Sequence, residues 1–151
     1  MAVVGWSDMG QRHEGGGAEL VAMARRPVEQ LHLDAIAAAR SSIYIENQYL
    51  TSTVLCAALA ETLARSEGPE VILILPGKAT GIFESGTMDV VRQRCLRRLR
   101  DADRHERLHI FTPVVSQRGA SAPVSVHSKV LIIDDRLLRI GSSNLSNRSM
   151  G

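Results

Sequence analysis

The sequence predicts an α/β fold with a mixed, mostly parallel sheet that is flanked by helices on both faces. From about residue 27 onward, segments with helical periodicity alternate with short apolar runs that suit strands. The run "EVILILP" at residues 70–76 is apolar on both sides, as expected for a strand covered on both faces. A chain of 151 residues with 44% apolar residues is large enough for one domain with its own core.

The chain is expected to begin with an arm and to continue as one domain. Residues 1–26 show no helical or strand periodicity and are predicted to be a linker or N-terminal arm. Pro27 suits the first turn of a helix, and apolar residues repeat at helical spacing after it, which predicts a helix at 27–40. The domain is therefore predicted to span residues 27–151.

The next elements keep the alternation of strands and helices. "SIYIE" is short and rich in β-branched and aromatic residues, and "RLHIFTP" has the same character. "TVLCAALAETLARSE" has the periodicity of a buried helix, whereas "GTMDVVRQRCLRRLRDAD" has an apolar stripe beside an arginine-rich face. These segments predict strands at 42–46, 70–76 and 107–113 and helices at 53–67 and 86–103.

The last elements form a hairpin that returns toward the earlier strands. The connection after residue 113 contains no helical pattern, so the next strand, at 126–133, is expected to run antiparallel to its neighbour. Asp134 and Asp135 are turn residues, and "RLLRI" at 136–140 is the return strand.

The composition of the chain indicates in which compartment it works and which classes of partner it binds. The formal net charge is only +2, so no overall basic field points to nucleic acid. Cys56 and Cys95 lie in apolar helical patterns, which fits reduced thiols packed as small hydrophobic residues. The sequence contains no targeting segment and no apolar run of the length of a membrane span. We expect a protein that is cytoplasmic or peripheral at the membrane.

Two basic residues are expected at the edge of the sheet where ligands bind. In parallel sheets the loops at the carboxyl ends of the strands share one edge, and that edge usually carries the ligand site. The antiparallel strand at 126–133 starts at this edge, which brings His127 and Lys129 beside the loops. Positions i and i+2 of a strand project to one side, so the two side chains are expected to point the same way.

Ser142 and Asn144 are expected on the same face as these two residues. If Ile133 faces Arg136, His127 faces Ser142 across the hairpin. If Asp134 faces Leu137 instead, His127 faces Asn144, and the turn has two residues in either register. A slip of one residue would send both to the opposite face, so the register is a sharp test.

The four side chains provide an imidazole, an ammonium group, a hydroxyl and a carboxamide. Phosphate-ester cleavage needs such parts: a nucleophile or acid, positive charge and neutral donors for the phosphate oxygens. One imidazole cannot act as nucleophile and acid in the same step, so the chemistry requires a second histidine across an interface. The pattern implies no cofactor and no metal, because the other histidines lack ligand spacing.

The spacing of these residues resembles the signature of the phospholipase D superfamily, the HKD motif. The string that matches the signature at every defined position is His127-x-Lys129-x4-Asp134-x6-Gly141-Ser142-x-Asn144. "IYIENQYL" at 43–50 resembles a segment that precedes the second signature of two-motif phospholipases D, and "NLSNRSMG" at 144–151 resembles the segment after that signature. The resemblance covers nearly the whole predicted domain.

The resemblance implies a metal-independent phosphodiesterase in which two signatures meet at a pseudo-twofold axis. One histidine forms a phosphohistidine, the other protonates the leaving group, and water or an alcohol completes hydrolysis or transfer. His127 would be the histidine of the second half, which is usually the acid. Lys129 and Asn144 would bind the phosphate oxygens, and Ser142 would support the site. Asp134 would complete the catalytic motif in a structural role.

The sequence departs from the family because it carries one signature and stops at Gly151, before the further strands that members have. We therefore expect a half-domain that is incomplete at its C-terminus and resembles the C-terminal catalytic half of a bacterial two-motif phospholipase D. The rival explanation is a one-motif homodimer, which builds the two-histidine site by symmetry. In either case the implied partner is a second half that carries the motif.

Glu46, Asn47 and Gln48 are possible supporting residues. They end the strand at 42–46 on the expected ligand edge, so they either orient the site and its loops or only bond the turn.

Three functions remain open. The favoured one is hydrolysis or transfer of phosphatidyl groups of phospholipids at a membrane surface, because "IENQY" and "NRSM" resemble the lipid branch of the family. The second is a metal-independent nuclease of the same fold that acts as a homodimer, for which a net charge of +2 provides little basic field. The third is a non-catalytic half-domain that only pairs with another chain.

Overall fold

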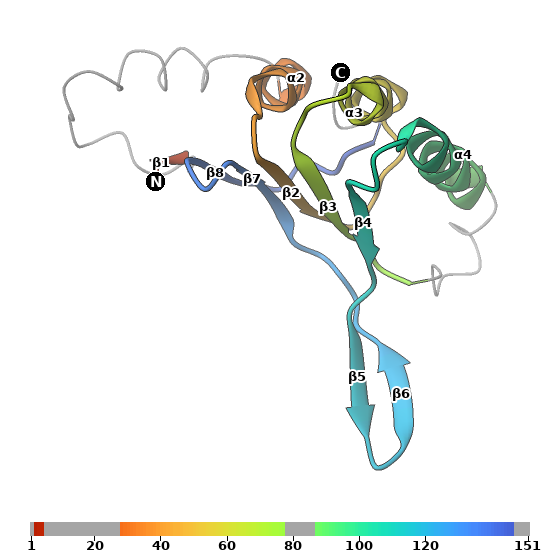
Figure 1. Ribbon diagram of the computed structural model, residues 1–151. Helices are drawn as coiled ribbons and strands as arrows, with labels where there is room; N and C mark the ends of the chain where they lie inside the picture. The colour runs from red at the N-terminus through yellow and green to blue at the C-terminus, as the bar shows by residue number, and fades with distance from the viewer. Residues whose placement is uncertain (1, 5–27, 78–86, 147–151) are drawn as a thin grey trace.

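Residues 2–4, 28–77 and 87–146 are described by the computed structural model, and they form a six-stranded sheet, a separate two-stranded hairpin and helices (Figure 1). The helices are α2 (Val28–Ala38), α3 (Thr53–Ala64) and α4 (Thr87–Ala102). The strands of the large sheet are β1 (Ala2–Val4), β2 (Ser42–Asn47), β3 (Glu70–Ile74), β4 (Leu108–Phe111), β7 (Lys129–Ile133) and β8 (Leu137–Ile140). The hairpin consists of β5 (Val114–Gln117) and β6 (Ala120–Pro123).

The large sheet is mixed and mostly parallel, as predicted. Its strand order is β1-β8-β7-β2-β3-β4. β2, β3 and β4 run parallel to one another and β1 runs parallel to β8, whereas β7 is antiparallel to both β2 and β8. The α/β class and the antiparallel return after the third predicted strand are therefore confirmed.

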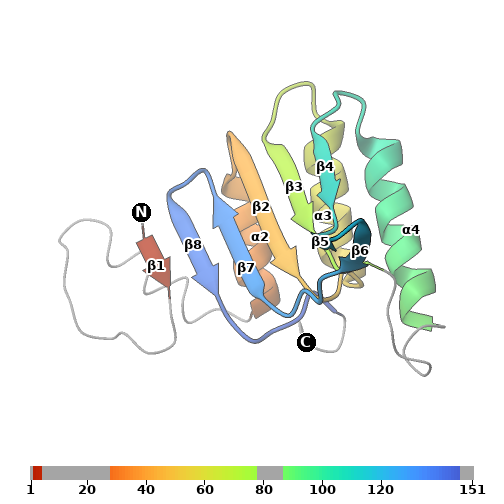
Figure 2. The same ribbon diagram turned by 90° about the horizontal axis from the view of Figure 1, so that it is seen from below.

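The described helices all cover the same face of the sheet (Figure 1, Figure 2). β2–α3–β3 and β3–α4–β4 are successive crossovers that step in one direction, and crossovers of one handedness then place both helices on one side. The chain returns from β4 to β7 without a helix. The sequence predicted helices on both faces, but no described helix covers the second face. Tyr44, Ile72 and Ile132 lie on this uncovered face and are only half-buried.

The core lies between the sheet and the helices. Side chains alternate along β2 and β7, so Ile43 and Ile133 point into the core while their neighbours point away. α3 contributes a fully buried stripe that includes Leu55 and Leu59. Ser52 caps this helix, because its side-chain oxygen accepts a hydrogen bond from the Leu55 N–H at 3.3 Å.

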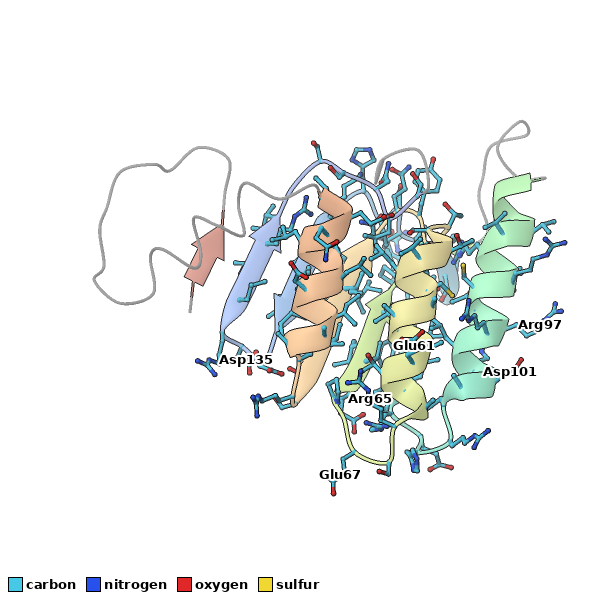
Figure 3. The ribbon with its side chains drawn as sticks, turned by 90° about the horizontal axis from the view of Figure 1, so that it is seen from above. Glu61, Arg65, Glu67, Arg97, Asp101 and Asp135 are labelled. Atoms are coloured by element: carbon cyan, nitrogen blue, oxygen red, sulfur yellow. The ribbon has the colours of Figure 1, made fainter. Side chains whose placement is uncertain are left out.

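The outer sides of the helices are charged, as the arginine-rich pattern indicates. Figure 3 shows Arg97 and Asp101 on the outer side of α4, and both side chains are exposed. Cys95 lies on the inner side of this helix, and Cys56 of α3 faces the same core. Both cysteines are buried and unpaired, in agreement with the prediction of packed free thiols.

β1 is a strand within residues 1–26 that the sequence pattern did not predict. Ala2–Val4 pairs in parallel with Leu137–Arg139 at the edge of the sheet. A three-residue edge strand is held by main-chain hydrogen bonds, so it leaves no readable side-chain periodicity. The rest of the predicted arm lies outside the described residues, and the division into arm and domain stays a prediction.

The register of the β7–β8 hairpin differs from the prediction by one residue. Ile133 pairs with Leu137, so the turn contains three residues instead of two. Asp134 and Asp135 both adopt positive φ, at 53° and 52°, a conformation that aspartate tolerates better than most residues. The two-residue turn assumed from the sequence is therefore wrong.

The Asp134 side chain explains why the turn has this shape. Its carboxylate accepts hydrogen bonds from the N–H groups of Arg40, Ser41 and Ser42 at 2.7 to 3.2 Å and from the Ser41 hydroxyl at 2.9 Å. Burial alone raises the pKa of this carboxyl, but the hydrogen bonds outweigh burial and lower the pKa to about 2. Asp134 thus ties the hairpin to the start of β2, which fits the structural role expected for it.

We predict that Asp134→Asn destabilises the fold, because the amide accepts fewer hydrogen bonds and lacks the charge. The pKa of Asp134 falls from 3.8 to about 2 on folding. The ionised form therefore contributes about 2 kcal/mol at neutral pH, and this contribution is lost as the pH falls from about 4 toward 2. Urea unfolding at several pH values measures the change.

Asp135→Asn, at the exposed neighbouring position (Figure 3), is the control and should change the free energy of unfolding by less than about 0.5 kcal/mol. Equal losses in both variants would contradict this role of Asp134.

Candidate active site

Lys129 holds a buried positive charge at the carboxyl edge of the sheet. The residue is only 6% exposed. Its Nζ donates to the His127 carbonyl at 2.6 Å and is 3.4 Å from Gln48 Oε1, and both acceptors are neutral. Burial lowers the pKa of Lys129, and within the described ranges no carboxylate pairs with it. A buried ammonium group that lacks a counter-charge is well suited to bind an anion.

Asn47 lies directly opposite Lys129 in the ladder between β2 and β7. The Asn47 side chain is buried, and its Oδ1 accepts hydrogen bonds from the N–H groups of Tyr49 at 3.1 Å and Leu145 at 3.2 Å. The Gly141 N–H donates to the Lys129 carbonyl at 3.1 Å. The Gly-Ser-Ser-Asn loop is therefore held at one end by Lys129 and at the other by Asn47.

This loop brings Ser142 and Asn144 to the edge, but not through strand pairing. β8 ends at Ile140, and the register places Gly141 rather than Ser142 or Asn144 beside Lys129. The prediction that both residues continue the strand on the face of Lys129 is wrong. Ser142 is exposed and Asn144 is half-buried. The buried Oδ1 of Asn144 has no hydrogen-bond partner in the part of the chain that the structure describes.

His127 is exposed and precedes the first residue of β7 by two positions. The ladder therefore does not orient its side chain, although its carbonyl is fixed by the Lys129 ammonium group. The imidazole is accessible from solvent at the same edge that buries the charge of Lys129. An exposed imidazole and a buried ammonium group thus belong to residues two positions apart at this edge.

Glu46 supports this segment from the opposite face of the sheet. Its Oε1 accepts a hydrogen bond from the Ser128 hydroxyl at 2.5 Å, and its Oε2 accepts one from the Tyr44 hydroxyl at 3.3 Å. Ser128 lies between His127 and Lys129, so Glu46 holds the backbone that carries both residues. No local pattern could have indicated this contact, because its partners are 82 positions apart.

Asp134 does not lie beside Lys129. It follows Ile133 at the far end of β7, whereas Lys129 begins the strand. Five strand residues span about 13 Å from first to last, so the carboxylate cannot contact the ammonium group.

Arg139 is a further buried cation that the sequence analysis did not single out. It lies on the core face of β8 opposite Leu131, and burial lowers its pKa. A Cβ atom at Gly141 would lie 3.1 Å from its guanidinium group, so glycine allows the arginine to pack against the loop. The available signal was an arginine at an inward position of the alternating strand "LLRI".

The protein is therefore an α/β domain that has a buried lysine at the edge where its parallel strands end, the usual place of a ligand site in such sheets. The family model described as "Cardiolipin synthase, PLD-like domain" matches residues 32–151. The chain therefore belongs to the phospholipase D superfamily, whose members are phosphodiesterases.

A solved structure shares this fold. NucT from Helicobacter pylori matches with a TM-score of 0.56 and 19% sequence identity, over 80% of this chain and 69% of that chain. At this identity the likeness establishes the fold alone. No curated protein gave a significant match to the sequence.

Neither α2, α3 nor α4 is long and apolar enough to cross a membrane. Among residues 2–4, 28–77 and 87–146, no group of three or more His, Cys, Asp and Glu side chains is arranged to hold a metal ion.

We predict that Lys129→Met leaves the fold intact or stabilises it. The change puts an apolar side chain in place of a buried ammonium group that no carboxylate of the described segments neutralises, which should raise the free energy of unfolding by about 1 kcal/mol. Urea unfolding at pH 7 measures it. Arg136→Met, at an exposed position of the same hairpin, is the matched control and should stay within about 0.5 kcal/mol. A loss above about 2 kcal/mol in Lys129→Met would mean that its hydrogen bonds hold the edge together.

Proposed function

We propose that the chain hydrolyses or transfers phosphatidyl groups of phospholipids, as a phospholipase D-type phosphodiesterase that needs a second half with its own histidine. The observation that carries the proposal is the buried ammonium group of Lys129, whose contacts among the described residues are with neutral oxygens. A phosphodiester would supply the missing negative charge. His127, exposed two residues away, would act on the same phosphate.

The proposed reaction divides the work between two imidazoles. A ring nitrogen of one attacks phosphorus, and the bond from phosphorus to the leaving oxygen breaks, which leaves a phosphohistidine. The other imidazole donates its proton to the leaving oxygen. Water or an alcohol then attacks phosphorus, its proton passes to the second imidazole, and the phosphorus–nitrogen bond breaks. By its position in the matching signature, His127 takes the acid role.

The remaining signature residues would stabilise the charge on the phosphate. Lys129 and Asn144 would bind the nonbridging oxygens, where charge accumulates in the transition state, and Ser142 would support the loop that carries Asn144. Asp134 would act only by holding the hairpin in register. The scheme uses no cofactor.

Two observations favour phospholipids over nucleic acid as the substrate. The matching family description names cardiolipin synthase. The net charge is only +2, and Arg97 of the arginine-rich helix α4 points outward from the domain (Figure 3). Homodimeric nuclease activity and a purely pairing role are the alternatives that a turnover assay distinguishes.

We predict that His127→Ala lowers phosphatidyl turnover by at least about a thousandfold, because it removes one of the two imidazoles. Headgroup release and transfer to an added alcohol are measured with phosphatidylglycerol vesicles at micromolar protein, and the mass in solution is determined in the same samples. Chelator should have no effect. His105→Ala, at an exposed position after α4, is the control and should keep the full rate.

Four outcomes would count against the proposal. Activity that survives His127→Ala, or that a chelator removes, contradicts the mechanism. Cleavage of DNA without lipid turnover assigns the site to nucleic acid instead. A dimer that turns over neither substrate supports the pairing role.

A further inference from the structure

The connection from β4 to β7 projects from the domain as the β5–β6 hairpin. The two strands pair with each other in a sheet of their own, and Figure 1 shows them extending away from the six-stranded sheet. Every residue of both strands is exposed. A two-stranded hairpin is only marginally stable in water by itself, so an exposed arm of this kind indicates a surface that binds something.

Large apolar side chains are exposed at the base of this arm. Val114 and Val115 are each 59% exposed, Phe111 before them is 54% exposed, and Val124 after β6 is 38% exposed. Val124 lies three residues before His127 in the chain. The apolar base of the hairpin is therefore next to the candidate active site.

The valines lie on both faces of the hairpin. Val114 pairs with Pro123 and Val115 with Ala122, and neighbouring residues of a strand point to opposite faces. The hydroxyls of Ser116 and Ser121 bond each other at 2.8 Å farther along. Neither face carries a charged side chain, so both sides of the arm can enter a partly apolar environment.

The arm has one cation and no carboxylate. No Asp or Glu occurs between residues 107 and 133. Arg118 forms the tip together with Gly119, and its φ of 50° is unfavourable for a long side chain. A positive tip on a neutral, partly apolar arm is complementary to a surface that presents negative charge above an apolar layer.

We propose that the β5–β6 hairpin docks on an anionic phospholipid bilayer and holds His127 at the level of the lipid phosphates. This inference rests on the proposed function, because it names the surface from which a phosphatidyl substrate is taken. Arg118 binds lipid phosphates, and the exposed valines at the base enter the interfacial layer. The unpaired backbone groups at the outer edges of the hairpin find partners only among water and phosphate oxygens, so the arm stays out of the hydrocarbon core.

Vesicle sedimentation with the full chain tests this docking. Vesicles of phosphatidylcholine and phosphatidylglycerol in equal parts are compared with pure phosphatidylcholine vesicles. The double variant Val114→Ser/Val115→Ser is expected to lower the partition coefficient at least about tenfold on the mixed vesicles. Arg118→Glu is expected to lower it at least about fivefold on mixed vesicles and to have little effect on neutral ones.

Matched controls come from the outer side of α4. Val90→Ser and Arg97→Glu change an exposed valine and an exposed arginine of a different element, and both variants should bind as the wild type does. His127→Ala should also bind fully. Sedimentation measures binding and the assay with His127→Ala measures turnover. A failure of the docking proposal can therefore be told apart from a failure of the catalytic proposal.

A second measurement is independent of any loss of binding. Cys56 and Cys95 are buried, so a thiol-reactive, environment-sensitive dye can be attached at Val115→Cys, with Val90→Cys as control. Mixed vesicles should shift the emission of the dye at position 115 to shorter wavelength and leave that at position 90 unchanged.

Several results would overturn the proposal. One is equal binding by the hairpin variants and the wild type, and another is an equal loss in the α4 controls. A dimer that becomes a monomer in the double valine variant, without vesicle binding, would assign the arm to a second copy of the chain. Binding of single-stranded DNA that Arg118→Glu abolishes, again without vesicle binding, would assign it to nucleic acid.

Discussion

The candidate site depends on the pairing of Asn47 with Lys129 across β2 and β7. This pair is where the antiparallel return meets the carboxyl ends of the parallel strands, and it anchors both ends of the loop from Gly141 to Leu145. The edge is therefore assembled by one cross-strand contact between segments far apart in the sequence. Among the described residues, the Lys129 ammonium group contacts neutral oxygens, an environment that suits an anionic ligand.

The charged residues at the two ends of β7 have opposite effects on the stability of the fold. At one end the Asp134 carboxylate accepts hydrogen bonds from three backbone N–H groups and a hydroxyl, and its negative charge stabilises the fold. At the other end the Lys129 ammonium group is buried and has no counter-charge among the described residues, and burial disfavours its ionised form. One short strand thus separates a charge that stabilises the fold from a charge that burial opposes.

The connection between β4 and β7 links the site to its surroundings. It contains no carboxylate, exposes valines on both sides of the β5–β6 hairpin, and ends at His127. A phosphodiester in a bilayer would meet an apolar, positively tipped arm before it reaches the imidazole and the buried ammonium group. The hairpin would therefore favour substrates that lie in a surface over substrates that are free in solution.

The order of the helices and of strands β2, β3, β4, β7 and β8, the antiparallel return and the family were predictable from the sequence, because apolar periodicity and the spacing from His127 to Asn144 are local properties. Only the tertiary structure decided the register, since the length of the turn depends on hydrogen bonds that Asp134 accepts from backbone N–H groups more than 90 positions earlier. It also decided that Lys129 is buried while His127 is exposed, and that the described helices share one face. Burial and register depend on contacts between distant segments, and no short stretch of sequence contains them.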